Sequence, residues 1–306
     1  LGAGRDGDVE RPLRRHQRRC PRSGLHRRGG RARDVHGLVR WCHRDADRAG
    51  GLLGGAGQPR PDHGPRRLAD RARLRDVLVV EGFRFGIVAS TIAILGGTGP
   101  EGKGLALRLA MGGETPIIGS RDTARGASAA EELAKTVPGV IIKGSDNSGA
   151  VAAADVVFLA FPYEGQRPVL KDLGPALKDK IVVSVIAPMK FERGKGASAV
   201  EVESGSAAEE AQEMLPDSQV VAAFQNASAE ELLNPDAVME GDVVVCSDHD
   251  EAKKLVMGLA DKIKNLRGVD GGTLANAKYV EQITPLLVNI NRIYKIHASI
   301  KIVGID

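Results

Sequence analysis

The 306-residue sequence has few of the residues that mark several classes of protein. Its three cysteines, Cys20, Cys42 and Cys246, form no C-x-x-C pair and no His/Cys spacing typical of zinc ligands. A disulfide framework and a metal site therefore have no support. No apolar run reaches the roughly 18 residues of a membrane span, and no signal peptide is visible. We expect a cytoplasmic protein that holds no metal and contacts no membrane.

Lysine is missing altogether from residues 1–85, which contain 21 arginines and 10 acidic residues, a net charge of +11. Residues 86–306 instead use 15 lysines, 7 arginines and 29 acidic residues, a net charge of −7. The first part also lacks a sustained helical or strand periodicity, and it mixes arginine pairs with glycine pairs. Such a segment cannot bury much apolar surface, so we expect disorder there.

Two interpretations of this arginine-rich part differ in their consequences. Arginine clusters are typical of arms that bind nucleic acid through salt-sensitive phosphate contacts. The composition also resembles translation of GC-rich sequence upstream of a true start, since the chain begins at Leu1 and Val88 corresponds to a possible GTG initiation codon. We favour the second interpretation. Residues 1–88 are then a disordered extension, and nucleic-acid binding is not expected.

The rest of the chain is organised around a glycine-rich turn. A short apolar run at residues 92–95 ends in Gly97-x-Gly99-x-x-Gly102, a spacing typical of dinucleotide sites. In such sites the first glycine allows a tight turn, the second admits the pyrophosphate, and the third lets a helix pack closely. A glycine turn alone is a weak signal. Here an apolar helix follows up to Gly112-Gly113, which supports the dinucleotide interpretation.

The next strand, at residues 116–119, predicts which coenzyme is bound. An Asp or Glu at the end of this strand would bind the ribose hydroxyls of NAD, but Ser120-Arg121 stands there. Arg121 and Arg125, one helical turn apart, offer two guanidinium groups to a 2′-phosphate. The sequence therefore predicts NADP over NAD. The alternative is a pair of solvated arginines at a helix start.

Alternating strands and helices continue to about residue 224. We expect helices at 125–134, 148–154 and 206–214, strands at 140–143, 155–162, 181–186 and 219–224, and a loop at 189–205. Together they predict an α/β fold with a Rossmann-type doubly wound, mostly parallel sheet of six strands. Phe161-Pro162-Tyr163 ends the fourth strand, so these residues are expected along the nicotinamide. A proline at a helix start with two core aromatics fits equally well.

The C-terminal part reads as small and mainly helical. A strand is expected at 243–246, an amphipathic helix at 251–264, and a long helix at 274–293 that Pro285 interrupts with a kink. That helix either caps the binding edge of the sheet or packs on a second subunit. Its polar residues favour solvated faces over a pocket: Asn276, Thr284, Asn289 and Asn291. We divide the chain into an NADP-binding domain at 89–229 and a region at 230–306 for capping, dimerisation and a second ligand.

Several separated motifs, in order, make residues 90–295 similar to the NADPH-dependent coenzyme F420 reductases, also called F420:NADP oxidoreductases. They are Gly96-Gly97-Thr98-Gly99 with the helix up to Ala110, Gly119-Ser120-Arg121, Phe161-Pro162-Tyr163-Glu164, residues 180–184, and the C-terminal helix with Thr284-Pro285-Leu286. The resemblance implies reversible hydride transfer between NADP(H) and the 5-deazaflavin coenzyme F420. It also implies a homodimer without a bound flavin.

The resemblance further implies the residues that hold the two coenzymes. The pyrophosphate turn would consist of Thr98, Gly99, Pro100 and Glu101, and the 2′-phosphate would be bound by Ser120, Arg121 and Arg125. The nicotinamide would lie along Phe161, Pro162, Tyr163 and Ala187. The deazaflavin would be bounded by Gln225, Asn226, Ala227, Ser228 and Ala229 with the C-terminal segment. An archaeal relative has His in place of Gln225, a departure from the family pattern.

We assign no catalytic acid or base. After residue 85 the only histidines are His249 and His297, and neither has a recognisable catalytic setting. Hydride transfer between two stacked rings makes little demand for proton transfer by the protein. A keto-acid or 3-hydroxyacid reductase would need such a group, with Lys278 and Glu281 as the nearest candidates. A surface ion pair between these two residues is the simpler interpretation.

Two further alternatives stay open at this point. The first domain also resembles the NADPH-to-flavin domain of ferric reductases, but those proteins are tethered to membrane helices. The chain could also be an NADP-binding sensor without turnover, in which the arginine-rich residues 1–85 form a nucleic-acid arm.

Overall fold

The computed structural model describes residues 91–305. The predicted disorder of the arginine-rich part and the possible start at Val88 lie outside the described residues. Within residues 91–305, no helix is both long enough and apolar enough to cross a membrane.

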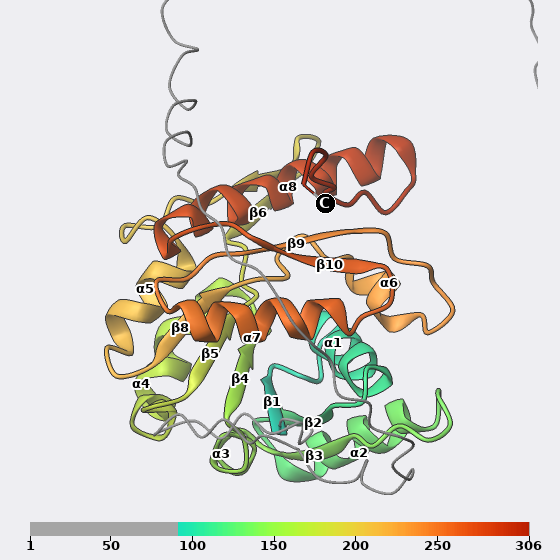
Figure 1. Ribbon diagram of the computed structural model, residues 1–306, viewed down its shortest axis with the longest axis vertical. Helices are drawn as coiled ribbons and strands as arrows, with labels where there is room; N and C mark the ends of the chain where they lie inside the picture. The colour runs from blue at the N-terminus through green and yellow to red at the C-terminus, as the bar shows by residue number, and fades with distance from the viewer. Residues whose placement is uncertain (1–90, 306) are drawn as a thin grey trace, which may run out of the picture. The chain divides into compact units, whose positions relative to one another are not determined.

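One parallel sheet forms the centre of the described fold (Figure 1). Its order is β3-β2-β1-β4-β5-β8, and every neighbouring pair is parallel. The strands are β1 (Thr91–Leu95), β2 (Thr115–Ser120), β3 (Lys143–Asp146), β4 (Val156–Leu159), β5 (Ile181–Ser184) and β8 (Gln219–Ala222). The order reverses between β1 and β4, as in the doubly wound dinucleotide-binding fold. This confirms the predicted fold class and the six-strand sheet.

Helices cover both faces of this sheet. They are α1 (Pro100–Met111), α2 (Thr123–Ala134), α3 (Asn147–Ala152), α4 (Gln166–Leu177) and α5 (Ala207–Met214). Successive strand residues point to opposite faces, so Ile92 and Ile94 pack in one hydrophobic core and Ala93 and Leu95 in the other. Burial on both faces explains why the strands read as continuous apolar runs.

One displaced strand boundary and one missed helix have local causes. β3 begins at Lys143, three residues later than predicted. The apolar residues 140–142, on which the prediction was based, lie before the strand, and Ile141 is 62% exposed. An edge strand is defined by its backbone pairing with β2, which apolar side chains do not reveal. α4 was not predicted, since Pro168, Gly174 and Pro175 interrupt its helical pattern.

The predicted loop at 189–205 is wrong in its first half. Residues there form an antiparallel hairpin of β6 (Met189–Glu192) and β7 (Gly196–Ala199). Asn289 in the C-terminal helix holds β7, accepting from Ala197 N–H at 2.8 Å and donating to Ala197 C=O at 2.7 Å. The hairpin depends on a residue about 90 positions away, so a local pattern could not predict it.

The C-terminal part is mainly helical, as predicted, and adds a second small sheet. It comprises α6 (Ala229–Leu233), β9 (Gly241–Val245), α7 (Asp250–Asp261), β10 (Leu266–Asp270), the short 3₁₀ helix η2 (Leu274–Asn276) and α8 (Ala277–Tyr294). β9 and β10 pair in parallel, and an antiparallel bridge joins Cys246 to Ala222 of β8. Val243, Val256 and Leu259 pack in the same hydrophobic core as Ile92 and Ile94 of β1. Neither α6 nor β10 was predicted.

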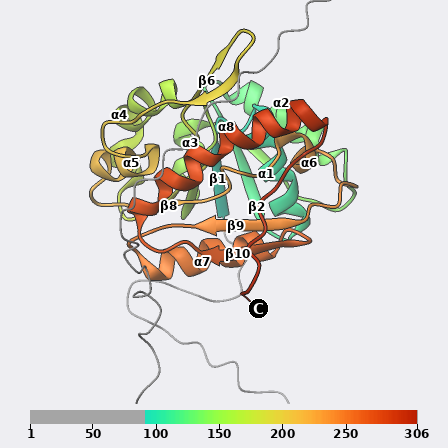
Figure 2. The same ribbon diagram turned by 90° about the horizontal axis from the view of Figure 1, so that it is seen from above.

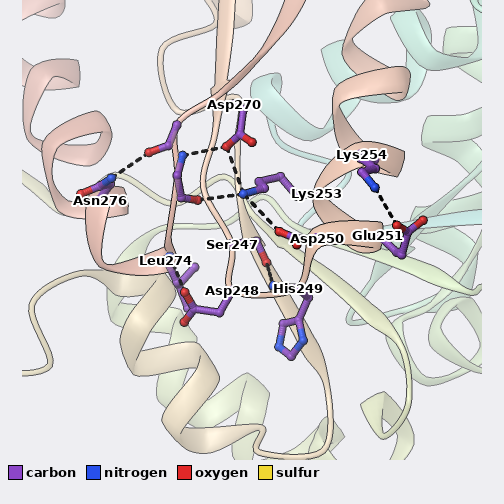
Figure 3. A network of polar contacts seen from close by, with 12 residues as sticks. Ser247, Asp248, His249, Asp250, Glu251, Lys253, Lys254, Asp270, Leu274 and Asn276 are labelled. Carbon is purple, nitrogen blue, oxygen red and sulfur yellow. Dashed lines mark hydrogen bonds and ion pairs between the residues drawn. The ribbon is translucent and has the colours of Figure 1, made fainter. Parts of the chain in front are cut away.

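A polar network fixes where α8 begins (Figure 3). The buried Lys253 of α7 lies 3.0 Å from Asp270 Oδ1 and donates to the Gly272 carbonyl at 3.3 Å. Asp248 Oδ1 accepts from Leu274 N–H at 3.1 Å, and Asn276 donates to the Gly271 carbonyl. These contacts tie the loop before α8 to α7. Figure 2 shows α8 running across the molecule beside the β6–β7 hairpin.

Candidate coenzyme site

The turn between β1 and α1 requires glycine at several positions. Gly96 has φ +74°, and a Cβ there would lie 2.4 Å from the Ala160 carbonyl oxygen. A Cβ on Gly97 would lie 2.7 Å from Ile94 O, and one on Gly102 would lie 2.6 Å from Gly97 Cα. The third glycine of the motif therefore lets α1 pack directly on the turn, as the sequence predicts. Gly96 adds a requirement that the motif did not include.

The start of α1 presents backbone N–H groups without a side-chain cap. Gly99 is the N-cap and Pro100 the first helical residue, so no side chain accepts from the first turn. The first N–H groups of a helix have no partner within the helix, which makes such an end a site for anions. This end lies at the boundary of β1 and β4, where the strand order reverses. A bound pyrophosphate fits this position.

Ser120, Arg121 and Arg125 lie together where β2 leads into α2. Ser120 is buried at the strand end, and both arginines are exposed. Within residues 91–305, neither guanidinium forms a hydrogen bond or ion pair. The Asp122 carboxylate lies between them in the sequence and accepts from Arg125 N–H at 2.9 Å as the N-cap of α2. The structure thus leaves two guanidinium groups available beside the strand end.

The segment after β4 matches the second interpretation, a proline at a helix start with two aromatics against the core. Pro162 is the N-cap of the 3₁₀ helix η1 (Tyr163–Gly165), and Phe161 and Tyr163 are partly buried against the core. The Tyr163 hydroxyl donates to Glu210 Oε1 at 3.1 Å. Burial, and then the neighbouring Glu210 carboxylate, raise the pKa of Tyr163. This hydroxyl is therefore a neutral donor to α5.

Residues 225–229 follow β8 at the carboxyl edge of the sheet. Gln225 is buried, and its Nε2 donates to the Ser184 carbonyl at 3.0 Å. Gln225 Oε1 and Ser184 Oγ are both shielded and have no partner within the described residues. Asn226 donates to Val280 O at 3.0 Å and to Thr284 Oγ1 at 2.8 Å. The segment predicted for the deazaflavin is thereby joined to the C-terminal helix.

Comparison with known proteins decides the family. The family model described as "NADP oxidoreductase coenzyme F420-dependent" matches residues 91–188. The F420-dependent NADP reductase of Methanothermobacter marburgensis is 40% identical over 205 residues, covering 65% of this chain and 92% of that protein. The enzyme of the same name from Methanocaldococcus jannaschii is 41% identical over 213 residues, covering 67% and 93%. This chain belongs to the F420-dependent NADP reductase family.

A solved structure agrees with this family at the level of the fold. The crystal structure of a proposed F420-dependent NADP reductase from Arthrobacter sp. FB24 superposes with a TM-score of 0.60 at 23% identity. The match covers 70% of this chain and 99% of the other. The doubly wound sheet and its helices are thus shared along nearly the whole of that protein.

In this reductase, the position of Glu281 corrects the prediction of a surface ion pair with Lys278. It does not form a surface ion pair with Lys278, since it is only 2% exposed. Its carboxylate accepts from the N–H groups of Ala207 at 2.8 Å and Ala208 at 3.1 Å, at the start of α5. Lys278 Nζ instead lies 5.0 Å from the ring centre of Tyr279. Burial raises the pKa of Glu281 to about 7, although the two amides act to lower it.

Thr284, Asn289 and Asn291 are partly buried and hydrogen-bonded, which corrects the prediction of solvated faces for these three residues, whereas Asn276 is exposed as predicted. Thr284 Oγ1 donates to the Gln225 carbonyl at 3.1 Å, and Asn291 Oδ1 accepts from Ala298 N–H at 2.6 Å. Asn289 and Asn276 bind the hairpin and the preceding loop, as described above. These side chains therefore hold α8 against the segments that line the proposed site.

Sequence reasoning missed the residues that set α6 against α1. A Cβ on Gly104 would lie 2.5 Å from Leu232 Cβ, so the two helices approach closely there. The buried Arg108 guanidinium donates to the carbonyls of Leu232, Glu231, Asn234 and Ala237 at 2.6–3.1 Å. In the sequence Arg108 reads as an ordinary helix residue. Its partners lie more than 120 positions away, so no local signal identifies them.

Proposed function

We propose that this reductase catalyses reversible hydride transfer between NADP(H) and coenzyme F420. The observation that carries the proposal is the 40–41% identity to two F420-dependent NADP reductases over more than nine-tenths of their lengths. The geometry of the glycine turn and of the carboxyl edge of the sheet supports it. NADP(H) supplies or accepts the hydride when bound, and F420 is the second substrate.

In this proposal the NADP(H) pyrophosphate lies on the uncapped start of α1, against Gly97, Thr98, Gly99, Pro100 and Gly102. Ser120, Arg121 and Arg125 bind the 2′-phosphate. The backbone N–H groups at the start of α1 have no side-chain cap, which supports the contact with the pyrophosphate. The two exposed guanidinium groups support the second, because planar guanidinium groups bind phosphate in a bidentate manner.

The two rings are proposed to meet at the carboxyl ends of β4, β5 and β8. Phe161, Pro162, Tyr163 and Ala187 line the nicotinamide, and residues 225–229 bound the deazaflavin. The unpartnered Gln225 Oε1 and Ser184 Oγ support this placement, because buried polar atoms normally have a hydrogen-bond partner. The small side chains of Ala187, Ala227 and Ala229 leave room for stacking. The protein then acts by orienting two rings and excluding water, without a general base.

A homodimer is the oligomeric state we expect for this enzyme. Tyr279, Leu286 and Ile293 recur every seven residues along α8 and are 62%, 54% and 70% exposed. Residues at this spacing lie along one stripe of a helix, and such a stripe is typical of a helix that packs on a partner. A second copy of the chain is the partner that the family resemblance implies.

The decisive experiment mixes the purified protein with oxidised F420 and follows the loss of its visible absorbance. We expect rapid loss with NADPH and little with NADH, because Arg121 and Arg125 bind the 2′-phosphate that only NADPH carries. Tight NADPH binding with no F420 reduction would contradict the proposed reaction. Equal rates with the two nicotinamide coenzymes would contradict the assignment of the arginines.

A further inference from the structure

Glu101 is an unusual acidic residue at the second position of α1, between Gly99 and Gly102 of the turn. Its Oε1 atom is shielded from solvent and has no hydrogen-bond partner within the described residues. Glu251 occupies the same second position of α7, but it is exposed and accepts from Lys254 Nζ at 2.8 Å. Glu101 as a whole is partly buried, so the shielding of its Oε1 atom is not a general property of the second helix position.

Glu101 lies on the side of α1 that packs against α6. Residues 101, 104 and 108 are three and seven positions apart, so they share one side of the helix. Gly104 packs on Leu232, and Arg108 donates to four carbonyls in and after α6. Figure 1 shows α1 and α6 side by side. Glu101 lies about one turn nearer the helix start on this side, within the glycine turn.

The charges around this position do not favour an ionised carboxylate. Burial raises the pKa of Glu101 to about 8. Arg108 on the same helix face is occupied by carbonyls, and Lys103 pairs with Glu132 at 2.8 Å. α6 contributes the acidic Glu230 and Glu231, and His297 lies 3.5 Å from Glu230. Across the turn, Arg121 and Arg125 stand at the start of α2 and Asp122 caps that helix. Within residues 91–305, no cation forms an ion pair with Glu101.

We propose that Glu101 keeps its proton and donates a hydrogen bond from its carboxyl group to an oxygen of bound NADP(H) beside the glycine turn. This inference rests on the proposed NADP(H) site and adds a side-chain contact to its backbone contacts. A protonated carboxyl group is a donor, whereas a carboxylate can only accept and would repel the coenzyme phosphates. Glu101 then makes the affinity for NADP(H) depend on pH.

The test measures NADPH binding without F420, by calorimetry from pH 7 to 9.5, in the full chain and three variants. In the unmodified chain the Kd should rise about tenfold or more over this range, because the donor is lost on ionisation. Glu101→Gln retains an N–H donor and should bind with nearly constant affinity. Glu101→Ala should bind about tenfold or more weakly at pH 7. Glu251→Gln, the matched control, should follow the unmodified chain.

A Glu101→Gln variant with the same pH dependence as the unmodified chain would overturn the inference. So would a Glu101→Ala variant that binds NADPH equally tightly at pH 7. If the alanine variant does not fold, the slope of the glutamine variant decides alone, and its melting temperature shows that it is folded. An unmodified chain that fails to bind NADPH overturns the proposed function and this inference together. NADPH binding without F420 reduction overturns only the proposed reaction.

Discussion

At the scale of single residues, three glutamate side chains differ in how the fold holds them. Glu210 is buried and accepts from Tyr163 and Gln166, and it also forms an ion pair with Arg167. Glu281 is buried against two backbone amides. Glu101 has a shielded oxygen without a partner. Because burial of an unpaired carboxylate is costly, this series explains why pKa values are raised at Glu281 and most strongly at Glu101.

Arg121→Asp tests coenzyme selection at this scale. We expect the KM for NADPH to rise roughly 10- to 100-fold, while the KM for NADH changes little. The change removes a charge-assisted contact to the 2′-phosphate of about 1.5–3 kcal/mol. Steady-state kinetics with both coenzymes provide the measurement. Arg193→Asp, an exposed arginine in the turn of the β6–β7 hairpin, is the matched control and should leave both values unchanged. An equal rise in the KM for NADPH and for NADH in Arg121→Asp would contradict the assignment of Arg121 to the 2′-phosphate.

Glu281→Gln tests the buried carboxylate at the start of α5. The pKa of Glu281 rises from 4.5 to about 7 on folding, so the native state binds more protons between these values. The free energy of unfolding must then fall as pH rises through this window, by up to about 3 kcal/mol. Denaturant unfolding from pH 4.5 to 8 should show a smaller fall in the variant, because an amide does not titrate. The raised pKa of Glu101 also makes the free energy of unfolding fall as pH rises, so the Glu281→Gln variant keeps some pH dependence.

Glu251→Gln is the control for this measurement, since Glu251 is exposed and its substitution should leave the slope unchanged. Identical slopes in Glu281→Gln and the unmodified chain would show that Glu281 titrates normally in the folded protein.

At the scale of elements, the proposed site depends on α6 and α8, which come from the C-terminal third of the chain. Arg108 and Gly104 of α1 fix α6, and Asn226 and Thr284 fix α8 to the segment 225–229. The Lys253 network in turn fixes the loop from which α8 begins. Long-range polar contacts therefore place the elements that are proposed to hold F420 against the NADP-binding part.

Arg108→Met tests the attachment of α6. The substitution keeps an apolar chain of similar length but leaves four carbonyl groups without their donor. We expect a loss of about 2–5 kcal/mol in the free energy of unfolding. Lys135→Met is the control, since Lys135 and Glu131 are both more than 70% exposed and such pairs contribute at most about 0.5 kcal/mol. Equal stability of the two variants in urea would contradict the role given to Arg108.

At the scale of the whole molecule, the exposed apolar stripe of α8 predicts the interface of a homodimer. Leu286→Glu places a charge in the middle of that stripe, and we expect it to convert a dimer to a monomer in sedimentation velocity. Ile141→Glu is the matched control, because Ile141 is also an exposed apolar residue, 62% exposed, and it lies on the segment before β3 instead of on α8. A monomeric unmodified chain, or a dimeric Leu286→Glu variant, would show that α8 does not form the interface.

The sequence by itself determined the features that arise from neighbouring residues. Glycine spacing identified the turn between β1 and α1, because the backbone conformation and the close contact at Gly102 exclude a side chain. Continuous apolar runs identified five of the six strands of the parallel sheet, since these strands are buried, but they placed β3 three residues too early. Ser120-Arg121 predicted the coenzyme from one strand end.

Only the tertiary structure decided which distant residues meet. Glu281 and Asn289 read as surface positions on a helix, but the fold places them against the start of α5 and against β7. Glu101 reads as an ordinary first-turn acid, but in the fold its Oε1 atom is shielded and has no partner within residues 91–305. Hydrogen bonds and desolvation depend on distances in space, and residues some 70 to 130 positions apart leave no mark of their contact in a local sequence pattern.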